Sequence, residues 1–342
     1  MEGVGNMERY ARQMVYRHIG PHGQERLLNS RVTVIGMGAL GTVTANNLCR
    51  AGVGFLRMVD RDYVEITNLQ RQMLYNEDDA RQGLPKAVAS YNHLSKVNSE
   101  ITLEPVIADV NSSNIEEIIR DVDLVLDASD NFEVRFLINE ACDKHVVSWI
   151  YCGALGSGGT TMNIIPNDNR PCLRCYVGES VSSPEQSCSA LGVLNMITAV
   201  MASIQTSEAV KILLGSDSVR RSLLSVDLWR NSFGSLDVIK DDDCPVCVHK
   251  RYEYLGKAAG SYTTVLCGGD SVQVVPAQVK RIDLNAVSER LSKIGSVKVS
   301  EHFLRFSDGK HDIMLFKDGR AIIKNAIDGS SAKSVYTEYI GL

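Results

Sequence analysis

The sequence has little cysteine, no large excess of charge of either sign, and no hydrophobic run that is long and free of polar groups. Nine cysteines in 342 residues are too sparse for a secreted scaffold held by disulfides. An odd number of cysteines is better explained by metal ligands together with free thiols. The formal net charge of −5 excludes the basic footprint of a chain that binds nucleic acid through its whole surface.

No targeting segment or membrane span is expected. Residues 1–13 have no apolar core of the kind that signal peptides need. The longest small-apolar stretch, residues 191–214, carries four polar groups that are costly in a bilayer. These are Asn195, Gln205, Glu208 and Lys211. We therefore predict a buried helix here and a soluble, cytoplasmic protein.

The first half of the chain alternates strand and helix signals. Near-continuous apolar strands between helices are typical of a parallel sheet covered on both faces. The expected strands are 31–36, 55–60, 101–108, 123–129 and 146–151, and the expected helices are 39–51, 84–97, 114–120 and 131–142. The fold class predicted is α/β, a Rossmann-like, mostly parallel sheet with helices on both faces.

The second half changes character twice. Residues 153–166 are glycine-rich and then strand-like, and residues 167–190 are loop-like. After residue 250 come a strand, a helix and four short strands with Asp-Gly turns, which are strong hairpin signals. Residues 251–342 carry 13 Lys and Arg against 10 Asp and Glu, so they hold +3 and the rest holds −8. We predict a domain over 1–250 and a small α+β accessory domain over 251–342.

A glycine motif follows the first strand and opens the first helix of this pattern. Gly36, Gly38 and Gly41 form G-x-G-x-x-G, which lets a phosphate approach backbone N–H groups at a helix N-terminus. Asp60 ends the next strand, where an acceptor for a ribose hydroxyl belongs. The motif predicts an adenine nucleotide and does not by itself separate NAD from ATP.

Three polar residues further along favour ATP. Asn68, Arg71 and Lys86 together are able to clamp a triphosphate. An NAD site holds only a pyrophosphate and has little use for three such groups. Arg71 or Lys86 taken singly is better explained as part of a solvated polar loop.

Asp130 follows the strand at 123–129. A carboxylate at the carboxyl end of a parallel strand faces the nucleotide crevice and suits Mg²⁺. Asp130 is equally suited to cap the helix that begins near Phe132. Both interpretations stay open from the residues alone.

Two C-x-x-C pairs predict a metal centre. Cys172 and Cys175 form the first pair, and Cys244 and Cys247 form the second. Four thiolates suit tetrahedral Zn²⁺ in a closed structural site. The alternatives are two unrelated pairs or redox dithiols, but neither pair opens a helix of a βαβ unit, as redox pairs do.

The other five cysteines carry weaker signals. Cys49, Cys142 and Cys152 fall in apolar patterns and are predicted to lie in the core. Cys188 precedes the long helix, and a helix N-terminus favours a reactive thiolate. Cys267 is ambiguous, and a quiet thiol is the default for each of the five.

Taken together and in this order, the motifs resemble the MoeB/ThiF family, prokaryotic relatives of ubiquitin-activating enzymes. The resemblance covers about residues 7–250. It rests on Arg9–Gln13, Gly36–Gly41, Asp60, residues 68–72, Pro85–Lys86, residues 129–131, both C-x-x-C pairs and the Cys188 segment.

The resemblance implies an ATP-dependent adenylyltransferase that activates the C-terminal glycine carboxylate of a ubiquitin-like, β-grasp sulfur carrier of the ThiS/MoaD type and releases pyrophosphate. ATP, Mg²⁺ and Zn²⁺ are the implied cofactors, the protein is implied to be a homodimer, and a sulfur donor such as a cysteine desulfurase is a further partner. The resemblance also implies a role for each candidate residue. The nucleotide phosphates are lined by Gly36, Gly38 and Gly41 and gripped by Asn68, Arg71 and Lys86, and the ribose is held by Asp60. Asp130 is implied to bind Mg²⁺, Arg12 to reach the nucleotide of the neighbouring protomer, and Cys188 to be the reactive cysteine.

Other functions remain open at this stage. An enzyme of the same fold that activates a small-molecule or tRNA carboxylate fits the same motifs. An NAD-dependent dehydrogenase explains the glycine motif and Asp60 but leaves Arg71, Lys86 and Asp130 without a role. A non-catalytic scaffold would be expected to lack those three residues, and all three are present.

Overall fold

The computed structural model describes residues 7–178, 192–257, 262–265, 271–276, 281–326 and 328–341. It divides the chain into two compact units, Met1–Lys257 and Ala258–Leu342. Each unit is described here by itself.

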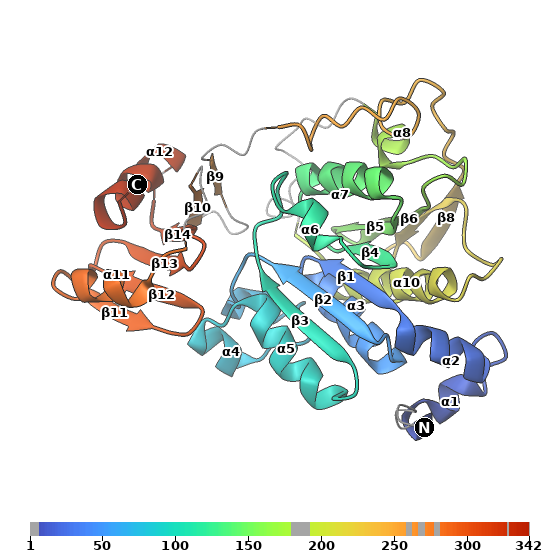
Figure 1. Ribbon diagram of the computed structural model, residues 1–342, viewed down its shortest axis with the longest axis horizontal. Helices are drawn as coiled ribbons and strands as arrows, with labels where there is room; N and C mark the ends of the chain where they lie inside the picture. Colours follow the sequence, from blue (N-terminus) through green and yellow to red (C-terminus); the bar gives the residue numbers. More distant parts are fainter. Residues whose placement is uncertain are drawn as a thin grey trace. The chain divides into compact units, whose positions relative to one another are not determined.

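The first unit is built on an eight-stranded sheet with the order β3-β2-β1-β4-β5-β6-β7-β8 (Figure 1). The pairings from β3 through β5 are parallel, and those from β5 through β8 are antiparallel. The strands are β1 Arg31–Ile35, β2 Phe55–Asp60, β3 Thr102–Ile107, β4 Leu124–Asp127, β5 Ser148–Leu155, β6 Gly158–Ile164, β7 Leu223–Asp227 and β8 Ser232–Leu236. The predicted α/β class with a mostly parallel sheet is confirmed.

Helices cover both faces of this sheet, which explains why its central strands are apolar on both sides. Val34 of β1 packs in the core with α3, α5 and α10, whereas Ile35 packs in the core with α6, α7 and α8. The bounds are α3 Ala39–Ala51, α5 Lys86–Val97, α10 Asn195–Leu213, α6 Ile115–Ile118, α7 Phe132–His145 and α8 Leu173–Val177. Cys49 lies in the first core and Cys142 in the second, and both are fully buried, as is Cys152.

Shorter elements complete the first unit. They are η1 Met7–Tyr10, α1 Ala11–Met14, α2 Gly20–Asn29, η2 Ile66–Asn68 and α4 Glu77–Gln82. Sequence reasoning missed α1 and α2, and it also missed the β7–β8 hairpin. Every residue of β8 is exposed, so no alternation of apolar and polar residues marked it as a strand.

The second unit is an α+β fold with an antiparallel sheet in the order β11-β12-β13-β14-β10-β9. Its strands are β9 Tyr262–Val265, β10 Ser271–Val275, β11 Ser296–Val299, β12 Phe303–Ser307, β13 Asp312–Phe316 and β14 Ala321–Lys324, and its helices are α11 Leu284–Leu291 and α12 Gly329–Tyr339. Asp283 and Asp328 cap the two helices with their side chains. This unit has a separate hydrophobic core, centred on residues such as Phe306, Leu315 and Tyr336.

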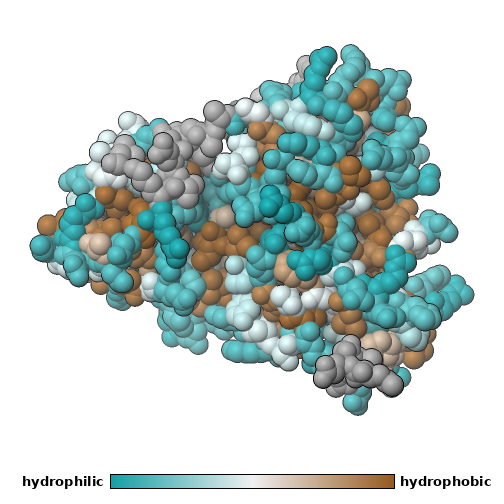
Figure 2. All heavy atoms as spheres, viewed as in Figure 1, coloured by the Kyte–Doolittle hydropathy of each residue, from teal (hydrophilic) through white to brown (hydrophobic). Residues whose placement is uncertain are grey.

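The view in Figure 2 shows hydrophilic side chains interspersed with hydrophobic ones over the visible face. Within the described residues, none of the helices combines the length and apolar character that a membrane span requires. The long helix α10 instead buries Met201, Gln205 and Glu208 inside the first unit, in agreement with the predicted buried helix.

Candidate functional site

The turn after β1 requires glycine at two positions for steric reasons. Gly36 has φ of +93°, and a Cβ there would lie 2.7 Å from the carbonyl oxygen of Ala128. A Cβ on Gly41 would lie 1.8 Å from the carbonyl oxygen of Gly36. Gly38 is different, because the nearest atom to its Cβ would be Gln72 Nε2 at 3.9 Å. The space beside Gly38 is therefore open to a bound group, as a phosphate-binding turn requires.

Two glycine substitutions separate these roles. Gly41→Ala is expected to lower Tm by about 4–10 °C, because it forces a backbone clash of the overpacking kind worth about 1–3 kcal/mol. Gly38→Ala is expected to leave Tm nearly unchanged and to weaken nucleotide binding. Calorimetric melting and nucleotide titration of both variants provide the measurement. Equal Tm losses in the two variants would contradict this division.

The turn presents backbone N–H groups at the start of α3. Gly38 is the N-cap residue, and no side chain of the described residues caps this helix. The first N–H groups of a helix have no partner within the helix, and with the helix dipole they attract anions. The turn lies between the carboxyl ends of β1 and β4, which is where the strand order reverses and ligands bind in open α/β sheets.

Asp60, at the end of β2, anchors this turn. Its Oδ2 accepts a hydrogen bond from the Met37 N–H at 2.6 Å, and its Oδ1 accepts one from the Asp62 N–H at 2.7 Å. Burial raises the pKa of Asp60, although the charge of Lys86 opposes the rise. Asp60 therefore fixes the backbone of the glycine turn, a role that the sequence motif did not reveal.

Lys86, the first residue of α5, is buried beside this turn. Its Nζ lies 3.2 Å from Asp62 Oδ2. Burial alone would lower the pKa of Lys86, but the charges of Asp62 and Asp60 raise it above its ordinary value. Lys86 thus stays an ammonium group at neutral pH. It supplies a fixed positive charge next to the glycine turn.

Further charged residues surround Lys86. Arg61 Nη1 donates to Asp109 Oδ1 at 3.0 Å, and Asp62 and Asp109 raise the pKa of Arg61 despite its burial. The charge of Asp130 acts on both Arg61 and Lys86. The structure therefore brings Asp60, Lys86 and Asp130 into one electrostatic group. Sequence reasoning missed Arg61, Asp62 and Asp109.

Asn68 and Arg71 lie on the segment that begins with η2. Asn68 is buried, and its side-chain oxygen accepts the Glu65 N–H at 3.1 Å as part of a capping box. Arg71 is partly exposed, and its Nη1 donates to the Thr67 carbonyl at 3.1 Å. Arg71 forms no ion pair with the described residues, and none of them accepts a hydrogen bond from the amide nitrogen of Asn68. Both are compatible with the predicted grip on a triphosphate.

The structure settles what caps α7. The Asn131 side chain accepts the Glu133 N–H at 2.8 Å and is the N-cap, so the interpretation of Asp130 as a helix cap is wrong. Asn131 has the extended backbone that an N-cap requires, and Asp130 lies one residue too early. Asp130 is exposed, which leaves its carboxylate accessible to a metal ion.

A buried ion pair supports the loop that carries Asp130. Asp127 Oδ2 accepts from Arg135 Nε at 3.1 Å, and Asp127 Oδ1 accepts from Ser129 N–H at 2.9 Å. Arg135 Nη2 also donates to the Ser129 carbonyl at 2.7 Å. Ser129 is therefore fixed through both its N–H and its carbonyl group. Sequence reasoning missed Arg135, and only its position four residues after the N-cap could have pointed to it.

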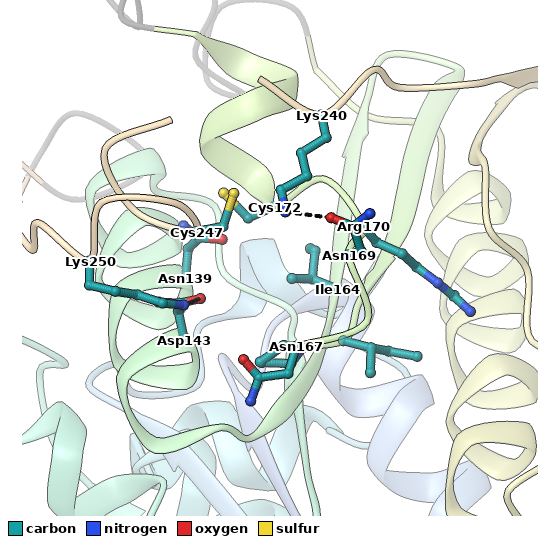
Figure 3. Close-up of a pocket in the computed structure, with 12 residues that line it drawn as sticks. Asn139, Asp143, Ile164, Asn167, Asn169, Arg170, Cys172, Lys240, Cys247 and Lys250 are labelled. Atoms are coloured by element: carbon teal, nitrogen blue, oxygen red, sulfur yellow. Dashed lines mark hydrogen bonds and ion pairs between the residues drawn. The ribbon is translucent and has the colours of Figure 1, made fainter. Parts of the chain in front are cut away.

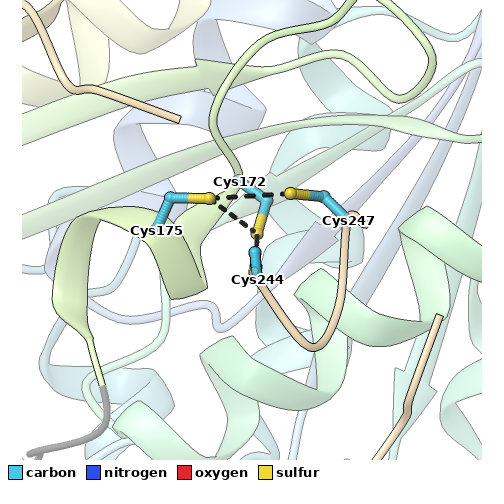
Figure 4. Close-up of side chains that lie close together, drawn as sticks. All are labelled: Cys172, Cys175, Cys244 and Cys247. Carbon is cyan, nitrogen blue, oxygen red and sulfur yellow. Dashed lines mark hydrogen bonds between the residues drawn. The ribbon is translucent and has the colours of Figure 1, made fainter. Parts of the chain in front are cut away.

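The two C-x-x-C pairs meet in space, as Figure 4 shows. Their four sulfur atoms lie within 4.8 Å of one another, with Sγ–Sγ distances of 3.7 Å for Cys172–Cys244 and 3.5 Å for Cys175–Cys247. A tetrahedral site with Zn–S bonds of about 2.3 Å has S–S edges of about 3.8 Å. The four thiol groups therefore fit Zn²⁺ in number, chemistry and spacing, and the interpretation as unrelated pairs is wrong.

A cavity of about 240 Å³ adjoins the cysteine cluster (Figure 3). Lys240 Nζ donates to Asn169 Oδ1 at 2.9 Å, and Lys250 Nζ lies 2.9 Å from Asp143 Oδ1. The lining of the cavity includes Cys172 and Cys247 but none of the predicted nucleotide-binding residues. We assign this cavity to the neighbourhood of the metal centre and not to the nucleotide site.

Of the two remaining predicted residues, the structure describes Arg12 alone. Arg12 is exposed on α1, which Figure 1 shows at the periphery beside α2, away from the β1–α3 turn. Cys188 lies outside the described residues, and so does Cys267.

Comparison with known proteins gives a consistent result. Residues 10–246 match the ThiF family. The chain is 37% identical over 336 residues to the sulfur carrier protein ThiS adenylyltransferase of Bacillus subtilis, which covers 97% of this chain and 99% of that protein. It is 33% identical over 245 residues to the molybdopterin-synthase adenylyltransferase of Escherichia coli, which covers 70% of this chain and 96% of that protein.

Solved structures agree on the fold. Escherichia coli MccB crystallised with ATP superposes with a TM-score of 0.61 at 21% identity, over 70% of this chain and 74% of that chain. At this identity the likeness shows the fold alone.

Proposed function

The chain belongs to the ThiF family, and on that premise we propose that it is an ATP-dependent adenylyltransferase that activates the C-terminal glycine carboxylate of a ubiquitin-like sulfur carrier. The observation that carries the proposal is the glycine turn at the start of α3 with Lys86 buried beside it. The named adenylyltransferases among its relatives, at 33–37% identity, argue against the NAD-dependent dehydrogenase.

The reaction needs positioning and charge stabilisation more than acid–base chemistry. The carboxylate of the carrier is already ionised at pH 7. Its oxygen forms a bond to the α-phosphorus of ATP, the bond between that phosphorus and the α–β bridging oxygen breaks, and pyrophosphate leaves with the electron pair. The phosphates are held by the N–H groups at the start of α3 and by the side chains of Asn68, Arg71 and Lys86. These groups neutralise the charge that develops on the phosphates in the transition state. Asp60 holds the ribose.

Two metal ions complete the proposal. Asp130 offers an exposed carboxylate next to Lys86 and Arg61, and a carboxylate is the ligand that Mg²⁺ prefers. Bound Mg²⁺ would shield the phosphate charge. Zn²⁺, held by Cys172, Cys175, Cys244 and Cys247, would have a structural role, because four protein ligands leave no position open for a substrate.

The carrier proposed is of the ThiS type. A relative that matches 97% of the chain at 37% identity is a ThiS adenylyltransferase, and a second ThiS adenylyltransferase matches 70% at 35%, whereas the molybdopterin-synthase relative matches 70% at 33%. A folded protein substrate also needs a surface on which to rest. The β7–β8 hairpin and the segment after it expose four large apolar side chains, a feature typical of interaction sites. These are Trp229, Phe233, Leu236 and Ile239.

Other parts of the proposal rest on family membership. We propose a homodimer in which Arg12, exposed on α1 beside exposed Val15 and Tyr16, reaches the nucleotide of the neighbouring protomer. Cys188 is proposed to take part in acyl or persulfide transfer, with a cysteine desulfurase as a candidate sulfur donor. The cluster of reduced thiols suits a cytoplasmic location. The second unit is proposed to be an accessory domain that docks the carrier or a downstream partner.

The decisive test is ATP–pyrophosphate exchange with Mg²⁺ and a panel of β-grasp carriers that end in Gly-Gly. We expect exchange with a ThiS-type carrier. Exchange with no carrier, despite measurable ATP binding, would contradict the proposed substrate. It would favour an enzyme of the same fold that activates a small-molecule or tRNA carboxylate.

Asp130→Ala is expected to reduce this exchange about 100-fold or more, because removing one charge-stabilising element of a transition state typically costs that much. The side chain is exposed, so Tm is expected to stay within about 2 °C of wild type. Raising the Mg²⁺ concentration should recover part of the activity. Asp123→Ala, at an aspartate before β4 and away from the turn, is the matched control. Exchange unchanged in Asp130→Ala would exclude Asp130 as a metal ligand.

A further inference from the structure

Tyr75 is a buried tyrosine that the proposed reaction has not used. It lies between η2 and α4, with 7% of its surface exposed. Its ring packs with Val64 and Ala89, and Leu69, from the segment that carries Asn68 and Arg71, packs against the same cluster. A buried tyrosine hydroxyl needs a hydrogen-bond partner, and this one has three.

The three partners come from two elements of the nucleotide site. The Tyr75 hydroxyl donates to the Met37 carbonyl at 2.7 Å, and the Lys86 carbonyl lies within 3.2 Å of it. The third partner is Ser90 Oγ on α5, at 3.0 Å. A hydroxyl has one proton and two lone pairs. The proton is shared between the Met37 and Lys86 carbonyl oxygens in a three-centre hydrogen bond whose shorter branch goes to Met37, and Ser90 is placed to donate to the Tyr75 oxygen.

Met37 and Lys86 are each held through both their backbone N–H and their backbone carbonyl. The Met37 N–H donates to Asp60 while its carbonyl accepts from Tyr75. The Lys86 N–H donates to the Asp62 carbonyl at 2.9 Å, while the Lys86 carbonyl accepts the longer branch of the hydrogen bond from Tyr75. Met37 lies inside the glycine turn, and Lys86 starts α5. One hydroxyl therefore connects the turn that receives the phosphates with the backbone that carries the lysine.

We propose that Tyr75 is a positioning residue, whose hydroxyl fixes the glycine turn and Lys86 relative to each other and so sets the geometry in which they hold the triphosphate. The inference rests on the proposed function, because it concerns the same nucleotide site. Burial keeps the hydroxyl protonated, since it raises the pKa of Tyr75 well above the ordinary value for tyrosine. The donor is therefore available over the whole working pH range.

The test compares Tyr75→Phe with wild type in three measurements. These are the Kd of Mg·ATP by calorimetric titration without carrier, kcat and KM for ATP in the exchange reaction, and Tm. Tyr75→Phe keeps the ring and removes only the hydroxyl. We expect kcat/KM for ATP to fall about 10- to 100-fold, since a small misplacement of reacting groups has an effect of this size. We also expect Kd for Mg·ATP to rise.

Tyr336→Phe in the second unit is the matched control. The Tyr336 hydroxyl is also buried and also donates to a backbone carbonyl, that of Gly319, at 2.8 Å. Its loss is expected to lower stability to a similar degree and to leave Kd and kcat/KM unchanged. Ser90→Ala removes the third partner but keeps both carbonyl contacts, so its kinetic effect is expected to stay below about 3-fold.

The inference would be overturned if Tyr75→Phe kept the Kd and kcat/KM of wild type. It would also be overturned if Ser90→Ala lost as much kcat/KM as Tyr75→Phe. Absence of exchange in the wild-type protein would instead count against the proposed function. The Mg·ATP titration needs no carrier, so in that case it would still decide whether Tyr75 positions the nucleotide site.

Discussion

Lys86→Met is expected to lower kcat/KM for ATP–pyrophosphate exchange about 100- to 1,000-fold, which is the usual effect of removing one preorganised charge from a transition state. Methionine keeps most of the length and the apolar stem of lysine and removes the ammonium group. Lys86 is 7% exposed, and its Nζ lies 3.2 Å from Asp62 Oδ2. Its charge acts in a water-poor environment, where electrostatic interactions are strong.

A loss of stability must be separated from this loss of activity. Lys86→Met leaves Asp62 and Asp60 without their nearest cation. The Asp62 side chain is 30% exposed, so the cost is expected to lie below that of a fully buried pair, which is about 3–5 kcal/mol. The double variant Lys86→Met with Asp62→Asn removes both partners of the ion pair. It is expected to recover much of the Tm and none of the activity. Recovery of exchange in the double variant would show that Lys86 serves the fold and not the reaction.

Cys244→Ser is expected to remove zinc and to lower Tm by about 10 °C or more, because zinc bound by four thiolates contributes directly to folding free energy. Cys244 is fully buried, and its sulfur lies 3.7 Å from that of Cys172. The site joins the start of α8 to the segment at residues 244–247. Without the ion, nothing comparable in strength would hold four thiols so close together.

Zinc content by mass spectrometry and Tm by calorimetry test this expectation. Cys49→Ala is the control, since Cys49 is an equally buried thiol on α3 that lies outside the cluster. It is expected to keep one zinc ion per chain and to lose the packing of its sulfur atom and the weak hydrogen bond from that sulfur to the Leu94 carbonyl. A Cys244→Ser protein that retains zinc and melts with wild type would exclude a structural metal centre.

Much of the proposed nucleotide site follows from the sequence, because its signals are local. Gly36 and Gly41 are needed where a strand turns into a helix, and the φ of +93° at Gly36 with the close approach of Gly41 to Gly36 gives the reason. Local spacing also places Asp60 at the end of the next strand. Apolar runs with helices between them determined the α/β class, since each central strand must be buried on both faces.

Only the tertiary structure decided which residues meet across the chain. The sequence left open whether Cys172 and Cys244, 72 residues apart, share a site, and the 3.7 Å between their sulfur atoms answers it. It left Asp130 as either a cap or a metal ligand, and the side chain of Asn131 takes the cap.

The same holds for the support of the site. No pattern in the sequence pointed to the bond from Tyr75 to the Met37 carbonyl, or to the pairing of Arg135 with Asp127. Local spacing determines backbone conformation, helix ends and the faces of strands. Hydrogen bonds between segments depend on how those elements pack, and packing is decided by the whole chain at once.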